Sequence, residues 1–216
     1  MTMNAYTLPP LAGNTVKSAV VLLHGYGANG EDLLDLGREW QALLPNTLFI
    51  SPDAPFPCEM SPLGRQWFSL ADYTPPALEA GARHAAPLLN AFLDKTLAEY
   101  GLDESALALV GFSQGTMMAL FTALRRTKQC AGIVGYSGAL LAADSLSKEL
   151  ISKPPVLLVH GEIDMVVPCD ASVTAKATLD TLNVPVTLHT LAWLPHSIDH
   201  QGIKWGGEFL QTVLTK

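Results

Sequence analysis

Apolar positions along the chain fall into two alternating kinds of segment. Short apolar runs, several of them rich in β-branched residues, predict strands at residues 19–23, 47–51, 107–112, 131–136, 156–160 and 186–192. Apolar residues at helical spacing predict helices between them, at residues 31–43, 78–100, 115–126, 143–151, 170–182 and 202–213. This alternation is typical of an α/β fold, with a mostly parallel central sheet and helices on both faces. Ligand chemistry in such a sheet belongs at the carboxyl ends of its strands.

The pattern shows no repeat, linker or second hydrophobic unit. We therefore expect residues 1–216 to form one domain, which is within the usual size range. One stretch, residues 52–76, fits neither kind of segment. It holds six prolines and the pair Trp67-Phe68, and its length predicts a functional loop over a site.

Composition and charge exclude several classes of protein. The net charge is −7 and there is no run of Lys or Arg, so nucleic acid is not an expected partner. The three cysteines, Cys58, Cys130 and Cys169, form no CxxC motif, which argues against a zinc site or a disulfide framework and favours the cytoplasm. Residues 1–11 lack the features of a signal peptide, and no apolar window is long enough for stable membrane insertion.

Ser113 is the first candidate for chemistry. It lies in Gly111-Phe-Ser-Gln-Gly115, between a predicted strand and a predicted helix, which is the context of a nucleophile elbow. The alternative is an ordinary turn with an exposed serine. Ser137, in Gly-Tyr-Ser-Gly-Ala, is a rival nucleophile, but its helix begins several residues later, behind a cap expected at Asp144.

A serine needs a base, and in this arrangement the order along the chain is serine, acid, histidine. Asp164 follows the strand at 156–160, and His196 follows the strand at 186–192, so both lie beyond strand ends. Asp164 could instead be a turn residue or helix cap, a role that suits Asp170 better. His196 and His200 have HxxxH spacing, but no third ligand is obvious nearby, so we expect no metal.

The segment Gly25-Tyr-Gly-Ala-Asn-Gly30 matches GxGxxG and has two interpretations. Asp53 closes the next strand, where the ribose-binding acid of a dinucleotide site would lie. The loop could equally offer amide protons to an oxyanion, with the backbone N–H groups of Tyr26 and Gln114 as the donors. The series Ser113, Asp164, His196 decides for the oxyanion, and Asp53 then becomes a turn residue.

These motifs resemble the carboxylesterase/phospholipase family of small α/β-hydrolases, which includes the acyl-protein thioesterases. The matching pieces are LLHGYGANGEDL, SPDAP, QWF, LVGFSQGTMMAL, VHGEIDMVVP and HSI, which span nearly the whole chain. The resemblance implies a hydrolase with a minimal lid or none and no cofactor, acting on small ester or thioester substrates. It implies Ser113, Asp164 and His196 as a triad and allows a homodimer, since the family includes dimers. The family's usual glycine before the catalytic histidine is replaced by Pro195.

Several apolar residues near the motifs could bind an acyl chain: Leu63, Trp67, Phe68, Met165, Val166 and Leu194. Each could instead be ordinary core. The absence of a basic amphipathic segment favours soluble esters, while lysophospholipids and acylated proteins remain alternatives. Two other classes stay open: a binding module on a hydrolase fold, and the nicotinamide-dependent oxidoreductase that the loop alone would predict.

Overall fold

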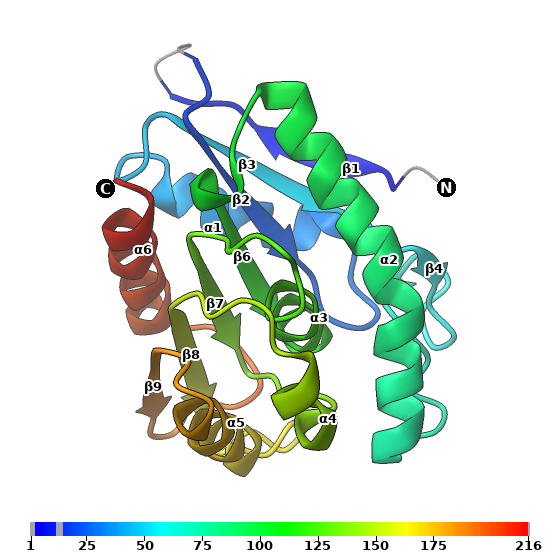
Figure 1. Cartoon of the computed structure of the whole chain (residues 1–216). Coiled ribbons are helices and arrows are strands. Elements are labelled where there is room, and N and C mark those ends of the chain that lie inside the picture. Colours follow the sequence, from blue (N-terminus) through cyan, green and yellow to red (C-terminus); the bar gives the residue numbers. More distant parts are fainter. Residues whose placement is uncertain (1–2, 12–14, 216) are drawn as a thin grey trace.

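The computed structural model describes residues 3–11 and 15–215. Residues 1–2 of the segment 1–11, which was analysed for a signal peptide, lie outside the described residues. Its main feature is a seven-stranded sheet in the order β1-β3-β2-β6-β7-β8-β9 (Figure 1). The strands are β1 (Ala5–Leu8), β2 (Ser18–Leu23), β3 (Thr47–Pro52), β6 (Leu107–Phe112), β7 (Gly132–Tyr136), β8 (Val156–Gly161) and β9 (Val186–Leu191). All neighbouring pairs are parallel except β1 with β3. The mostly parallel sheet is confirmed.

Helices cover both faces of the sheet (Figure 1). One face carries α1 (Leu34–Trp40), preceded by a 3₁₀ turn (Gly30–Leu33), and α6 (His200–Leu214). The other carries α2 (Pro75–Tyr100), α3 (Gln114–Ala123), α4 (Ala143–Glu149) and α5 (Asp170–Thr181). A second 3₁₀ turn, Glu104–Ala106, leads into β6. No helix in the described part of the chain is long and apolar enough to span a membrane.

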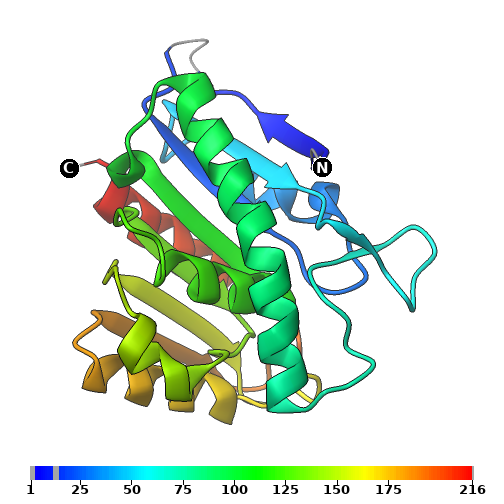
Figure 2. The same ribbon diagram turned by 45° about the vertical axis from the view of Figure 1, so that its right-hand side comes forward.

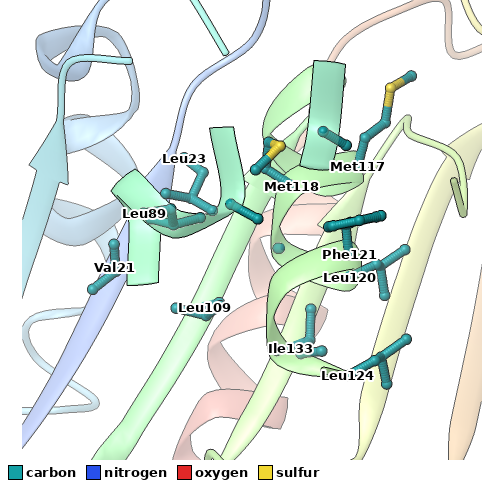
Figure 3. Packing of buried hydrophobic residues seen from close by; sticks show 14 of the residues in the cluster. Val21, Leu23, Leu89, Leu109, Met117, Met118, Leu120, Phe121, Leu124 and Ile133 are labelled. Atoms are coloured by element: carbon teal, nitrogen blue, oxygen red, sulfur yellow. The ribbon is translucent and has the colours of Figure 1, made fainter. Parts of the chain in front are cut away.

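The strand period of two residues separates two cores. Val21 and Leu23 of β2 point to the face of α2 and α3, whereas Val20 and Leu22 point to the face of α1 and α6. Figure 3 shows part of the first core, in which Leu109 and Ile133 of the sheet belong to one cluster with Leu89 of α2 and Leu120 of α3. Each fully buried side chain of this size stabilises the fold by about 1.5–3 kcal/mol relative to an exposed one. The continuous apolar runs of the sequence are therefore strands buried on both faces.

The predicted elements differ from the structure mainly at their ends. The α2 helix begins three residues earlier than predicted, at Pro75, because prolines fit the first helical positions, where no amide donor is needed. The β1 strand has no alternation of apolar and polar residues and was not predicted. The caps expected at Asp144 and Asp170 are wrong: each lies inside the first turn of its helix, α4 or α5, and the residues before those helices cap with no side chain.

The irregular segment between β3 and α2 forms a small hairpin of β4 (Phe56–Pro57) and β5 (Arg65–Gln66). Figure 2 shows this segment, drawn in cyan to teal, extending at one side of the molecule. Two backbone hydrogen bonds tie it to the glycine-rich loop, from the Gly27 amide to the Arg65 carbonyl at 2.9 Å and from the Arg65 amide to the Ala28 carbonyl at 2.7 Å. The segment therefore lies beside the loop that follows β2.

Candidate active site

Ser113 stands at the sharp turn between β6 and α3. Its backbone has φ 55° and ψ −117°, a strained conformation for a residue with a side chain. The flanking glycines are required by close packing: a Cβ on Gly115 would lie 1.8 Å from the Leu23 carbonyl oxygen, and one on Gly111 would lie 2.3 Å from the Thr116 amide nitrogen. The sequence GFSQG thus forms the sharp strand-to-helix turn that is typical of a nucleophile elbow, with its serine at the carboxyl edge of the sheet.

Asp164 and His196, which are 32 residues apart, are directly hydrogen-bonded. The Nδ1 atom of His196 lies 2.7 Å from Oδ2 of Asp164. The other carboxylate oxygen accepts from the amides of Val166 at 2.8 Å and Val167 at 2.9 Å. Burial raises the pKa of Asp164, but the hydrogen bonds from His196 and the two amides outweigh it and hold that pKa below its ordinary value. An ionised carboxylate only accepts, so the proton of a neutral His196 lies on Nδ1 and its Nε2 is left as a base.

His160 supports the turn that carries Asp164. Its ring is fully buried, with Nε2 2.8 Å from the Val167 carbonyl oxygen and Nδ1 2.7 Å from the Ser172 hydroxyl. A carbonyl oxygen only accepts, so the hydrogen bonds assign the proton to Nε2. His160 thereby links the end of β8, the 164–167 turn and α5.

Packing brings His196 to the residue beside Ser113. The imidazole of His196 and the ring of Phe112 have centroids 4.8 Å apart. Among the described residues, no hydrogen bond joins Ser113 to His196 itself. Such contacts are often long without substrate and tighten when it binds. The structure therefore brings the three candidates to one edge of the sheet. Within the described residues, the hydrogen bond between Asp164 and His196 is formed, and the one between His196 and Ser113 is not.

The glycine-rich loop after β2 lies against the elbow. A Cβ on Gly25 would lie 3.4 Å from Cβ of Ser113. Gln114 is the first residue of α3, so its amide N–H has no acceptor within the helix. The Tyr26 amide likewise donates no hydrogen bond within the described chain. Two uncommitted amide donors thus border Ser113, one on the loop and one on the helix.

Asp53 has a structural role at this loop. Its Oδ1 accepts from the Gly30 amide at 2.9 Å. A Cβ on Gly30 would lie 2.4 Å from the Ser51 carbonyl oxygen, which explains the last glycine of the GxGxxG pattern by packing on β3. The Asp53 carboxylate that could have bound a ribose therefore binds the protein's own backbone, although Asp53 does not lie in the turn that the sequence predicted.

Trp67 and Phe68 belong to the core, so their predicted place in an open acyl groove is wrong. Their exposed fractions are 0% and 3%. The Trp67 indole donates to the His24 carbonyl at 3.0 Å, and the Gln114 side chain accepts from the Trp67 amide and donates to the Phe68 carbonyl. The proline-rich segment turns inward here because these hydrogen bonds fasten it to the elbow and the glycine-rich loop.

The other proposed acyl-binding residues are accessible. Leu63, Met165 and Val166 are exposed at 91%, 92% and 62%, and Leu194 is half-buried. Sequence reasoning missed further exposed apolar side chains on the same loops: Met60, Ile163 and Trp193. Two of them could have been found from their position in the sequence, because Ile163 directly precedes Asp164 and Trp193 lies three residues before His196.

The rival serine is placed differently. Ser137 is 1% exposed, and α4 does not begin until Ala143, so no helix N-terminus follows it directly. Its hydroxyl has no hydrogen-bond partner within the described residues. Ser113 therefore remains the serine with the setting of a nucleophile.

Within the described residues, no group of three or more His, Cys, Asp or Glu side chains is arranged to hold a metal ion.

The chain is similar to known proteins over almost its whole length. The family model described as Phospholipase/Carboxylesterase matches residues 12–214. The chain belongs to this family. The phospholipase/carboxylesterase fold and the expected resemblance are thus confirmed, and the protein is an ester or thioester hydrolase of the α/β-hydrolase class.

Individual relatives agree with the family. The chain is 26% identical to Esterase YpfH of Escherichia coli over 200 residues, which cover 93% of this chain and 84% of that protein. It is 26% identical to Acyl-protein thioesterase 1 of Emericella nidulans over 235 residues, covering 99% and 97%. The crystal structure of esterase PE8 superposes with a TM-score of 0.95 at 42% identity, covering 99% of this chain and all of that one.

Proposed function

We propose that this phospholipase/carboxylesterase hydrolyses esters or thioesters of small to medium acyl chains through a triad of Ser113, His196 and Asp164. The observation that carries the proposal is the 2.7 Å hydrogen bond from His196 to a buried Asp164, at the same edge as the strained elbow of Ser113. We also propose that residues 1–216 act as one catalytic domain. The cytoplasmic location and the homodimer stay predictions.

The proposed reaction has two steps. Ser113 Oγ attacks the acyl carbonyl carbon while Nε2 of His196 takes the hydroxyl proton, and the tetrahedral oxyanion binds the Tyr26 and Gln114 amides. Each amide contributes about 3 kcal/mol, the cost measured when such a donor is removed elsewhere. The proton then passes to the leaving alcohol or thiol as the C–O or C–S bond breaks. Water attacks the acyl-serine by the same proton route and releases the acid.

Asp164 contributes without changing its own protonation. Its hydrogen bond keeps the Nδ1 proton of His196 in place and stabilises the imidazolium that forms during attack. The Val166 and Val167 amides hold the carboxylate in the orientation that this bond needs. The low pKa of Asp164 means that the carboxylate is ionised at neutral pH.

The exposed apolar loops support an acyl chain longer than acetyl. Leu63 lies on the loop beside Gly27, since a Cβ on neighbouring Gly64 would lie 2.2 Å from the Gly27 carbonyl oxygen. Met165 and Val166 flank Asp164, and Trp193 is near His196 in the chain. Apolar side chains on three loops around one site suit a hydrocarbon chain. Lipid-like substrates, such as lysophospholipids or acylated proteins, are the second candidate on the same observation.

Labelling with a fluorophosphonate tests the triad. We expect one adduct at Ser113 by mass spectrometry, none in Ser113→Ala, and an unchanged adduct in Ser137→Ala. Rates on p-nitrophenyl esters of increasing chain length, and on matched thioesters, then define the substrate. A folded protein that neither labels nor hydrolyses would favour a binding module. Labelling at Ser137 would overturn the assignment of the nucleophile.

A further inference from the structure

His24 is a fully buried histidine whose two ring nitrogens are both engaged. Its Nδ1 lies 2.7 Å from the Gly25 carbonyl oxygen, and its Nε2 lies 2.9 Å from the Ala54 amide nitrogen. A backbone amide can only donate, so Nε2 must accept. The hydrogen bonds therefore assign the proton of the neutral ring to Nδ1, which donates it to Gly25.

The environment keeps this ring neutral. Burial lowers the pKa of His24, and the Arg65 guanidinium acts in the same direction. The Gly25 carbonyl and the carboxylates of Asp53 and Asp32 oppose this shift but do not cancel it. A second proton would lie on Nε2 and face the N–H of Ala54, which has no other acceptor there. His24 is thus a fixed donor toward Gly25.

The Gly25 carbonyl belongs to the same peptide group as the Tyr26 amide. The described chain has no cis peptide bond, so the C=O and N–H of this group point in opposite directions. The carbonyl is held on the side of His24 Nδ1 and of the Ala28 amide, which donates to it at 3.3 Å. The Tyr26 N–H is therefore directed to the other side, where no group of the described chain accepts it.

We infer that His24 is a positioning residue, which orients the Tyr26 amide toward the oxyanion by holding the carbonyl at the opposite end of the same peptide group. The inference rests on the proposed function. The support is rigid on both sides of His24: the Trp67 indole donates to its backbone carbonyl at 3.0 Å, and Ala54 holds its ring. A donor fixed before the reaction begins needs no reorganisation when charge develops.

Two substitutions of His24 test its two side-chain hydrogen bonds one at a time. In His24→Asn, the side-chain amide nitrogen takes the place of Nδ1 and can still donate to Gly25, while the Ala54 amide loses its acceptor. In His24→Gln, the longer side chain reaches the place of Nε2 and can accept from Ala54, while Gly25 loses its side-chain donor. Each variant loses one buried hydrogen bond, so both should show similar decreases in melting temperature.

The two His24 variants should differ in activity although they are similar in stability. We expect kcat within about threefold of wild type for His24→Asn and a fall of about tenfold or more for His24→Gln, with KM little changed, since loss of a whole oxyanion donor costs about 10²–10³-fold. Affinity for an alkyl boronic acid, which forms a tetrahedral adduct with the serine, should fall in parallel with kcat. Equal kcat in the two variants, or boronate affinity unchanged in His24→Gln, would overturn the inference.

Controls separate this result from loss of stability and from failure of the proposed function. Ser152→Ala removes a partly buried hydrogen bond to the Arg126 carbonyl, away from the carboxyl edge, and should leave kcat unchanged. Hydrolysis that survives in Ser113→Ala would remove the proposed function and, with it, the role of His24. If the His24 variants do not fold, nitrogen NMR of the wild-type protein tests the assignment, and a proton on Nε2 at neutral pH would contradict it.

Discussion

The Oδ2 atom of Asp164 accepts the Nδ1 proton of His196 at 2.7 Å, while two backbone amides hold the other carboxylate oxygen. This arrangement fixes both the tautomer and the orientation of the imidazole. Nothing in it requires substrate, so it is prepared in the free protein. We expect the contact between Ser113 and His196 to form when an acyl group binds.

Asp164→Asn should lower kcat by about 10⁴-fold, because an amide group can stabilise the wrong tautomer of His196. The asparagine oxygen can still accept from Val166 and Val167, but its amide nitrogen would face the protonated Nε2 of His160, which lies 3.3 Å from Oδ2, so we expect a modest decrease in melting temperature. Steady-state kinetics and thermal unfolding check both. Asp170→Asn, in the first turn of the neighbouring α5, is the control and should be fully active. Equal activity in the two variants would exclude a role for Asp164.

Gly115→Ala should be strongly destabilising, because its Cβ would lie 1.8 Å from the Leu23 carbonyl oxygen and neither backbone segment can move cheaply. The expected loss is about 3 kcal/mol or more of the free energy of unfolding. Gly101→Ala is the comparison: φ is +63° and nothing lies within 4 Å, so it should cost only about 1–2 kcal/mol. Urea denaturation measures both, and a cheaper Gly115→Ala would contradict the packing at the elbow.

The pH dependence of stability should carry a contribution from His24. The pKa of His24 is lowered in the folded protein from 6.5, so the unfolded chain binds more protons just below that pH. The stability due to the neutral ring is complete above pH 6.5 and decreases as the pH falls, by at most about 1.4 kcal/mol per pH unit. Denaturation of wild type and His24→Asn between pH 7.5 and 5 should give a steeper loss for wild type. Parallel curves would contradict this.

Trp67→Ala should destabilise the fold by about 3–5 kcal/mol, because the indole is fully buried and donates to His24. An aromatic residue that only lined an open groove would cost far less. Trp193→Ala is the matched control, since that side chain is 84% exposed, and we expect little change in its melting temperature. Similar losses in the two variants would show that Trp67 is not part of the core.

Polar substitution of the exposed apolar loops should change chain-length preference without affecting stability. Leu63→Ser and Met165→Ser should lower kcat/KM several-fold on esters of long acyl chains and leave acetyl esters almost unchanged, since each lost apolar contact is worth about 1 kcal/mol. Ile151→Ser, at an exposed apolar position just after α4, is the control and should have no effect. A uniform loss across chain lengths would contradict contact with the acyl chain.

Much of the fold and the candidate site could be predicted because local physics decides them. Strands buried on both faces read as continuous apolar runs, and helices show the spacing of one buried stripe. The elbow sequence at Ser113 requires two glycines, and strand ends in a parallel sheet meet at one edge. Order along the chain was therefore enough to predict that Ser113, Asp164 and His196 lie at the same edge.

Other features depend on neighbours that are distant in the chain, and only the tertiary structure decided them. His24 and His160 each precede a glycine at a strand end and look alike in the sequence, yet their protons lie on opposite nitrogens because Ala54 offers a donor to one and Val167 an acceptor to the other. Trp67 lies in a proline-rich segment, yet its side chain is fully buried and its indole donates a hydrogen bond to the His24 carbonyl. Hydrophobic periodicity in the sequence shows which face of a helix or strand a side chain occupies. The hydrogen-bond partner of that side chain depends on which distant part of the backbone packs against it.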